Sequence, residues 1–404
     1  MQKLPKLIYL DYAATTPVDP QVMKVMAPFF SENFGNPSSL YRMGKKATEA
    51  LSVSRQQIAE FIGAETSEII FTAGGTESVN LAIRGAIETA KKAGIIKPHI
   101  ITSKIEHDSV LECINQLGRE GAEVSFIDND KEGFINPNSL KPLLKKNTVL
   151  VSIIYANNEV GTIEPIAEIG KIIKSNNRKR TEQKQRPVLF HTDACQALGL
   201  PEINVQTLGV DMLSANSSKV YGPKQVGFLY IKKGIELEPI LYGGGQERNL
   251  RSGTENVPGI VGFGEAVRIL KKNVRNENAS ISHLQKHCWS ELRKNFKDLQ
   301  LNGPTPGSKR LVNNLNFRIP GIEGESLMFY LDSLGFQVST GSACSAGDGK
   351  PSRVLLSLKS SEAESLESIR VTLGRYTTKK EIDSFLKALK KSVVILKSTI
   401  NDRI

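Results

Sequence analysis

The sequence predicts an α/β protein: a large domain with a mostly parallel seven-stranded sheet, followed by a smaller α+β domain. One observation is a repeated order of apolar run, polar or glycine-containing turn, and helical stretch, which is typical of parallel strands joined by helices. Another is the length, because 404 residues exceed what one small core holds. The apolar runs lie at Ile69–Phe71, His99–Ile101, Val124–Ile127, Val149–Ile154, Val188–Phe190, Val210–Leu213 and Val226–Ile231.

Other elements surround this repeat. Ile8–Leu10 is expected to form a short strand before the turn-rich segment 11–17, and Arg42–Ile62 has helical spacing. A long helical pattern containing Phe263 and Val274 is expected to lead into the second domain.

The second domain is predicted from two alternating patterns and a terminal helix. Apolar and polar residues alternate over 315–319 and 369–373, as in half-buried strands. Thr378–Glu381 matches a capping box before an amphipathic helix. We expect the large domain at residues 16–258 and the small domain at residues 1–15 and 259–404.

Composition and charge exclude several classes of protein. The chain is 39% apolar and 24% charged, and it has no apolar run of the roughly 18 residues that a membrane span needs. No secretory signal pattern is present, and the four cysteines lack metal-ligand spacing, so we expect a cytoplasmic protein without a membrane segment. The net charge is +11, and part of it lies in residues 171–186. That stretch is expected to be a solvated helix end plus loop; contact with an acidic partner stays open, but no nucleic-acid motif accompanies it.

An acid and a lysine at two strand ends organise the chain. Asp193 follows one apolar run and Lys219 follows the next, 26 positions later (219 − 193). Pyridoxal phosphate (PLP) needs a lysine amine for its Schiff base and an acid that keeps its ring nitrogen protonated. A turn-capping aspartate and a surface lysine are the alternative for such a pair alone.

Three further strand ends carry polar side chains. Gly75 and Thr76 lie between a strand and a helix, where glycines and helix N–H groups can hold a phosphate. His107 follows the next strand and is placed to stack on a ring or move protons, and Asn157 lies in a turn whose amides could orient substrate or cofactor. Ligands bind at this edge of parallel sheets, so we expect one shared site.

The second domain offers two more candidates. Arg370 is expected to project from the strand face opposite the core, free to bind a carboxylate; a solvated strand arginine is the alternative. Cys344 lies in a small, polar, glycine-rich loop, where a thiol can be a nucleophile if its thiolate is stabilised.

Together these residues resemble the cysteine desulfurase family, NifS/IscS type, over nearly the whole chain. The matching motifs are LDYAATTP at 10–17, FGNPSS at 34–39, FTAGGTES at 71–78, SKIEH at 103–107, ANNEVG at 156–161, DACQ at 193–196, KVYGPK at 219–224, RSGT at 251–254, STGSAC at 339–344 and SIRVTLGRYTT at 368–378. The resemblance implies a homodimeric PLP enzyme of the aspartate-aminotransferase-like fold. Such enzymes convert L-cysteine to L-alanine while a cysteine of the protein becomes a persulfide.

The resemblance also implies residue roles for cofactor binding. Lys219 would carry PLP as a Schiff base, Asp193 would pair with the ring nitrogen, Gln196 would bond the ring oxygen, and His107 would stack on the ring. The phosphate would be held by Gly75, Thr76, Ser217 and Ser218, with Thr254 reaching across from the partner subunit.

Substrate roles follow in the same way. Arg370 would bind the cysteine carboxylate, Asn157 would help to fix substrate and ring, and Cys344 would take the sulfur. The persulfide would pass to an iron–sulfur scaffold or a tRNA-thiolation carrier. No metal site is expected apart from transient iron–sulfur ligation through Cys344.

Some positions depart from the family pattern. The residues before the lysine are Asn216, Ser217 and Ser218, where the family usually has Ser-x-His. Losing a charge-assisted bond to the phosphate costs roughly 1.5–3 kcal/mol, so we expect weaker PLP retention than in typical relatives. The chain also ends at Ile404 without the family's usual tail, which leaves open which protein accepts the sulfur.

Two other functions remain. A related PLP lyase or aminotransferase acting on another amino acid is one, although Cys344 in GSAC argues against it. The other is a catalytically faded relative that serves as a binding partner in a sulfur-transfer assembly.

Overall fold

A seven-stranded sheet forms the centre of the molecule in a computed structural model that describes residues 7–341 and 350–401. The strands are β2 (Ile69–Thr72), β3 (His99–Ser103), β4 (Glu123–Ile127), β5 (Thr148–Ile154), β6 (Leu189–Asp193), β7 (Met212–Asn216) and β8 (Gly227–Ile231). Their order is β2-β8-β7-β6-β5-β3-β4, and only β8 runs antiparallel to its two neighbours. The prediction of seven strands in a mostly parallel sheet is confirmed.

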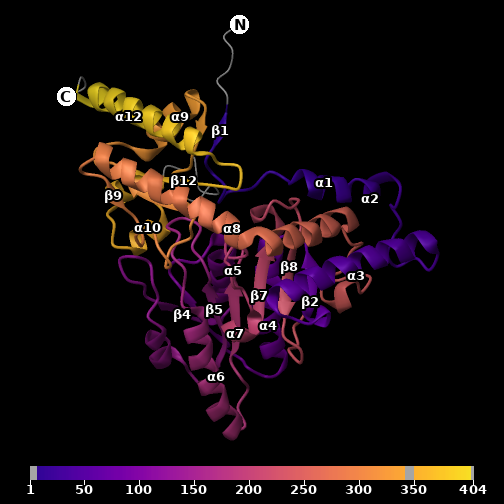
Figure 1. Ribbon diagram of the computed structural model, residues 1–404. Coiled ribbons are helices and arrows are strands. Elements are labelled where there is room, and N and C mark those ends of the chain that lie inside the picture. Colours follow the sequence, from indigo (N-terminus) through magenta and orange to yellow (C-terminus); the bar gives the residue numbers. More distant parts are fainter. Residues whose placement is uncertain (1–6, 342–349, 402–404) are drawn as a thin grey trace.

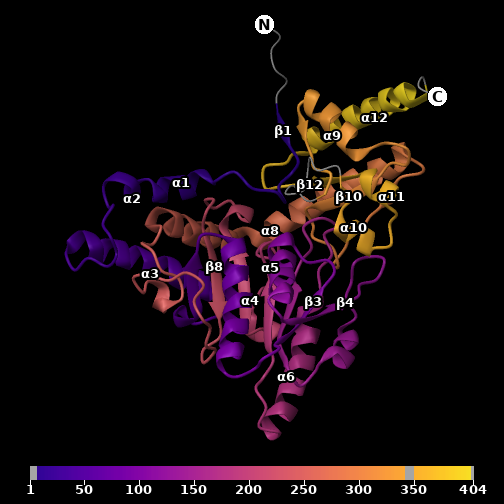
Figure 2. The same ribbon diagram turned by 180° about the vertical axis from the view of Figure 1, so that it is seen from behind.

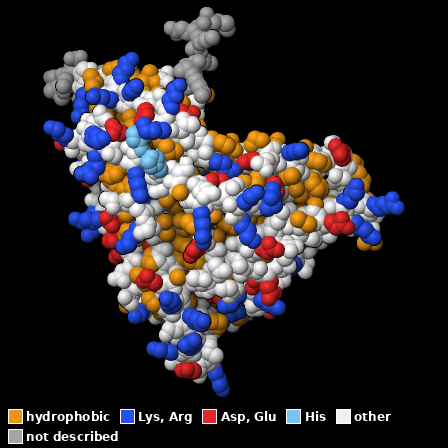
Figure 3. Space-filling model, viewed as in Figure 1, with side chains coloured by type: hydrophobic (Ala, Val, Ile, Leu, Met, Phe, Trp, Pro, Cys, Tyr) orange, Lys and Arg blue, Asp and Glu red, His pale blue; other side chains and the backbone are white. Residues whose placement is uncertain are grey.

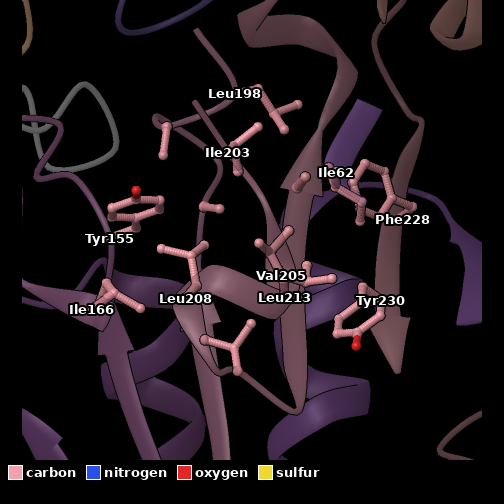
Figure 4. Close-up of a cluster of buried hydrophobic side chains, with 14 of the residues drawn as sticks. Ile62, Tyr155, Ile166, Leu198, Ile203, Val205, Leu208, Leu213, Phe228 and Tyr230 are labelled. Carbon is pink, nitrogen blue, oxygen red and sulfur yellow. The ribbon is translucent and has the colours of Figure 1, made fainter. Parts of the chain in front are cut away.

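Helices cover both faces of this sheet. One face packs on α4 (Gly75–Lys92) and α5 (Asp108–Arg119), which lie in front of the strands in Figure 2. The other face packs on α3 (Arg42–Ile62) and α6 (Ile166–Glu182). Strand residues alternate between the two cores: Leu213, Phe228 and Tyr230 lie in the second one (Figure 4), whereas Met212 and Leu229 lie in the first.

Shorter elements complete the large part of the chain. They are the helices α1 (Pro20–Met26), α2 (Pro28–Ser31) and α7 (Val205–Leu208), and 3-10 turns at Thr66–Glu68, Pro137–Leu143, Ser217–Lys219 and Glu247–Asn249. Helix α1 packs against α8 (Val257–Asn295) through Val22 and Met26.

The C-terminal part has its own sheet and core. Strands β12 (Ser368–Thr372), β10 (Asn314–Arg318) and β9 (Gln300–Leu301) pair antiparallel, and β1 (Ile8–Tyr9) pairs with β11 (Phe336–Gln337). Its helices are α9 (Gly324–Ser333), α10 (Arg353–Ser357), α11 (Glu362–Leu366) and α12 (Lys379–Asn401). The predicted capping box forms before α12, because Thr378 and Glu381 each bond the other's backbone N–H.

Helix α8 joins the two parts of the molecule (Figure 1). Its first half, up to Val274, packs into the core beneath the large sheet, and its second half, from Leu284, packs into the C-terminal core with Leu10. We propose that residues 16–258 form the large domain and residues 1–15 and 259–404 the small domain. Helix α8 passes from the core of the first into the core of the second.

The end of α6 is strongly basic. Lys174, Arg178, Lys179 and Lys184 are exposed, as expected for a solvated helix end. Basic side chains gather at the tip that lies lowest in Figure 3. Arg180 is the exception, since it is buried and donates to the carbonyls of Lys145, Lys146, Thr148 and Arg186. In residues 7–341 and 350–401, no helix combines the length and apolar character that a membrane crossing requires.

Candidate active site

A cavity of about 200 Å³ lies at the carboxyl edge of the parallel strands, where the sheet meets β12. The structure brings seven of the predicted site residues to its wall: Gly75, Thr76, His107, Asp193, Gln196, Lys219 and Arg370. They come from both parts of the chain. A larger cavity of about 330 Å³ adjoins it across Gln196 and Lys219, but its lining lacks Asp193 and Arg370.

Four segments that follow strands at or beside the cavity are held by short-range hydrogen bonds. Each has a side chain that accepts the backbone N–H two residues later: His107 from Ser109, Asn157 from Glu159, Asp193 from Cys195, and Asn216 from Ser218. These bonds measure 2.8–3.1 Å. Such turns let a polar side chain shape its own loop, so the local sequence positions each residue.

The N-terminus of α4 has the features of an anion cradle. Its N-cap is Gly74, which gives no side-chain cap, and Gly75 and Thr76 are the first helical residues and line the cavity. A Cβ on Gly75 would lie 2.6 Å from Sγ of Cys195, so glycine is required by close packing. Because Gly74 has no side chain that could accept from the first-turn N–H groups, these groups remain available to an anion in the cavity.

Lys219 meets the N-terminal segment of the chain across the cavity. Its Nζ donates to the carbonyl oxygens of Ala13 at 2.8 Å and Ala14 at 2.5 Å. Nε2 of Gln196 also donates to the carbonyl of Ala13, at 2.9 Å. The amine is thus held at the cavity wall by backbone oxygens.

Asp193 is buried at the end of β6 and its neighbour Cys195 lines the same cavity. Burial and the Asp193 carboxylate raise the pKa of the Cys195 thiol well above its usual value. Cys195 therefore stays a neutral thiol and is a poor nucleophile. Burial likewise raises the pKa of Glu106, whose Oε1 accepts from Ser103 and from the N–H of Ile154, to about 8.

Arg370 reaches the cavity but differs from its expected state. The side chain is 1% exposed, and its NH2 group donates to Oδ1 of Asp11 at 2.8 Å. NH1 donates to the carbonyl of Asn158 at 3.0 Å. The strand face that was expected to be open is covered by the N-terminal segment, so the guanidinium is buried and paired rather than free.

Other predicted residues lie away from the wall. Asn157 is fully buried, with Oδ1 accepting from Glu159 and Val160 and Nδ2 donating to Ile105, which leaves one amide hydrogen. Ser217 and Ser218 are buried and do not line the cavity, and Thr254 is exposed on the surface. Cys344 lies outside the described residues.

Sequence reasoning missed part of the wall. Ala13 and Ala14 contribute carbonyl oxygens, and Asn158 and Cys195 contribute side chains or backbone beside predicted positions. The turn-rich DYAATTP segment was a signal that something other than a strand followed Ile8–Leu10. Among the residues with assigned positions, no three His, Cys, Asp or Glu side chains gather as metal ligands.

An α/β fold with an acid and a lysine at the strand ends of the large sheet, and an arginine from β12 beside them, defines the class of cofactor-dependent α/β enzymes. The family model described as aminotransferase class-V matches residues 8–385. The cysteine desulfurase IscS of Dictyoglomus turgidum is 45% identical over 97% of this chain and 95% of its own. The chain belongs to the class-V aminotransferase family, in the branch of the IscS and NifS-like proteins.

Solved structures agree with this placement. A NifS-like protein superposes with a TM-score of 0.88 at 35% identity, covering 96% of this chain and 100% of its own. SspA in complex with cysteine superposes with a TM-score of 0.77 at 34% identity, covering 92% of this chain and 99% of its own.

Proposed function

We propose that this protein is a PLP-dependent cysteine desulfurase that removes sulfur from L-cysteine and releases L-alanine. The observation that carries the proposal is the meeting of Lys219, Asp193 and Arg370 in one cavity. An amine, a ring-nitrogen acid and a carboxylate-binding guanidinium are the three groups that this chemistry requires. IscS relatives at 42–45% identity and the cysteine-bound SspA support the substrate.

The residues of the cavity fit PLP. The first turn of α4 has no side-chain cap and offers its N–H groups to a phosphate. A side chain at position 75 would press on Sγ of Cys195, so a glycine fits this close approach. Asp193 would face the ring nitrogen, Gln196 the ring oxygen, and Lys219 the reactive carbon. PLP, when bound, withdraws electrons from the substrate Cα and weakens the C–S bond.

Protein groups supply binding and proton transfer. Arg370 would hold the substrate carboxylate through its unused N–H donors, and Lys219 would accept or return a proton through Nζ. Because Nδ1 of His107 accepts the N–H of Ser109, the neutral ring carries its proton on Nε2. His107 would therefore stack beside the ring and donate through Nε2.

The persulfide would form on Cys344, whose thiol is the expected acceptor of the substrate sulfur. It would then pass to an acceptor protein of iron–sulfur cluster assembly or tRNA thiolation. A cytoplasmic location goes with this proposal, since Cys113, Cys195 and Cys288 are unpaired thiols, as in reducing compartments.

A homodimer is part of the proposal. Large apolar side chains are exposed on α2, in the loop before α3, and at Tyr242: Phe30 and Phe34 are 64% exposed and Leu40 is 89% exposed. We take these segments as the candidate dimer interface, because exposed apolar patches commonly mark interaction sites. Thr254, exposed on the same domain, would then reach the phosphate site of the partner subunit.

One assay tests the function. With L-cysteine and a reductant, the wild type should form L-alanine and sulfide in equal amounts, and Cys344→Ala should lose both. The matched control is Cys113→Ala, a buried thiol on α5 away from the cavity, which should keep activity. Alanine without sulfide would point to another lyase; neither product from yellow, PLP-loaded protein would favour a faded relative.

A further inference from the structure

The ion pair between Arg370, which lines the cavity, and Asp11, which does not, has no part in the function proposed so far. Asp11 and Arg370 are separated by 359 positions, and their side chains are 14% and 1% exposed. Their closest atoms, Oδ1 and NH2, lie 2.8 Å apart. Arg370 is also the predicted binder of the substrate carboxylate, so Asp11 touches the group that substrate must use.

The fold places Asp11 at this point through the N-terminal segment. Leu10 accepts the N–H of Thr372 at 2.8 Å, and the Thr372 hydroxyl accepts the N–H of Ala13 at 2.9 Å. These bonds align residues 10–13 beside β12, with Asp11 opposite Thr372, two positions along the strand from Arg370. Asp11 is therefore held opposite the guanidinium by backbone contacts and not by the ion pair alone.

The guanidinium keeps unused donors. Of its five N–H groups, one goes to Asp11 and one to the Asn158 carbonyl. Nε is buried and has no partner among the described residues. The nearby buried acid Glu159 accepts from the Ser352 hydroxyl through Oε2, and its charge interacts with Arg370 without a hydrogen bond to the guanidinium.

We propose that Asp11 is a positioning residue: the resident counter-ion of Arg370, which aims the guanidinium at the cavity and weakens its hold on amino-acid carboxylates. A substrate or product carboxylate at Arg370 would be the second anion on one buried cation, and two anions at that range repel. The pair would thus let L-alanine leave after each turnover. This inference rests on the proposed function, since it takes Arg370 as the carboxylate site.

Calorimetric titration of the PLP-loaded protein with L-alanine tests the inference. Asp11→Asn keeps a hydrogen-bond acceptor but removes the charge, and it should bind L-alanine roughly tenfold more tightly than the wild type. Asp11→Ser, a second neutral variant, should show the same direction. L-alaninol, which lacks the carboxylate, should bind all three proteins with the same affinity.

The matched control is Asp19→Asn. Asp19 forms a comparable pair with Arg375, at 2.7 Å, but Arg375, unlike Arg370, does not line the cavity, so the loss of the Asp19 charge should leave alanine affinity unchanged. Equal or weaker alanine binding in both neutral Asp11 variants would overturn the inference while the proposed function stands. If the wild type and Arg370→Ala bind alanine equally, Arg370 is not the carboxylate site and the inference falls; the alanine and sulfide assay then decides separately whether the proposed function stands.

Discussion

The two walls of the cavity are held in place in different ways. The strand-end wall is braced locally, because His107, Asn157, Asp193 and Asn216 each accept an N–H two residues further on. The opposite wall is braced by bonds between distant residues: Asp11 with Arg370 across 359 positions, and Ala13 with Lys219 across 206. The first wall depends on short sequence patterns, and the second depends on how the whole chain folds.

This difference has an energetic consequence. Each local brace is a neutral or singly charged bond to a backbone N–H, of the kind that contributes about 1 kcal/mol. The contacts between distant residues include the Asp11–Arg370 ion pair, and removing one partner leaves the other charge uncompensated. Variants of the two walls should therefore separate activity from stability.

The largest expected effect is on catalysis, at the residue where both walls meet. Lys219→Ala should lower L-alanine formation by at least roughly 10³-fold, because the amine carries the proton transfers and the cofactor. Its stability should fall by only about 1 kcal/mol, since Nζ bonds two backbone carbonyls. Alanine assays and urea unfolding would check both; retention of a tenth of the activity would contradict the assigned role.

The next largest effect compares the distant ion pair with one of the local hydrogen bonds. Arg370→Ala should lower the free energy of unfolding by about 3–5 kcal/mol, because Asp11 is left buried without its partner. Asn216→Ala, which removes a local brace, should cost about 1 kcal/mol. Adding Asp11→Asn to Arg370→Ala should restore part of the loss. Equal destabilisation by the two single variants would break the comparison.

A smaller effect concerns cofactor retention. Ser218 donates to Asn216 and stays off the cavity wall, where relatives are expected to have a histidine near the phosphate. Asn216→Ser combined with Ser218→His should tighten PLP binding by roughly tenfold or more, through a regained charge-assisted bond. The PLP dissociation constant, followed by absorbance on dialysis, gives the answer. An unchanged constant would mean that the departure from the family pattern carries no cost.

The last prediction concerns the pH dependence of stability. Burial raises the pKa values of Glu106 and Glu164 from 4.5 to about 8, so the folded protein holds two protons that the unfolded chain releases. Stability from these groups is complete below the unfolded pKa and is lost as the pH rises towards 8. Burial lowers the pKa values of His99 and His191 to about 4, which acts in the opposite direction but only below about pH 6.5.

Between pH 6.5 and 8, Glu106 and Glu164 therefore determine how the free energy of unfolding changes with pH. The free energy of unfolding should fall by up to about 1.4 kcal/mol per pH unit for each proton. Glu106→Gln and Glu164→Gln should each reduce this pH dependence by the contribution of about one proton, as measured by urea unfolding at several pH values. A slope that neither variant alters would show that these carboxyls ionise in the folded protein.

Much of the fold was predictable because it depends on local patterns. Each of the seven apolar runs became a strand, and the Arg42–Ile62 helix and the Thr378–Glu381 capping box formed as expected. Asp193 and Lys219 were predicted to share an edge, since parallel strands bring their carboxyl ends together. The burial of Arg370 was not predicted, because alternation shows which strand face a residue occupies but not what covers it.

The sequence by itself determined which residues carry the chemistry and which loops hold them, because strand periodicity and two-residue turns act over a few neighbouring positions. Only the tertiary structure decided that Asp11 pairs with Arg370, that Cys195 packs on Gly75, and that the Ala13 carbonyl meets Lys219. Those contacts join segments up to 359 positions apart. They depend on sheet register and on the course of α8 through both cores, which no short pattern of residues encodes.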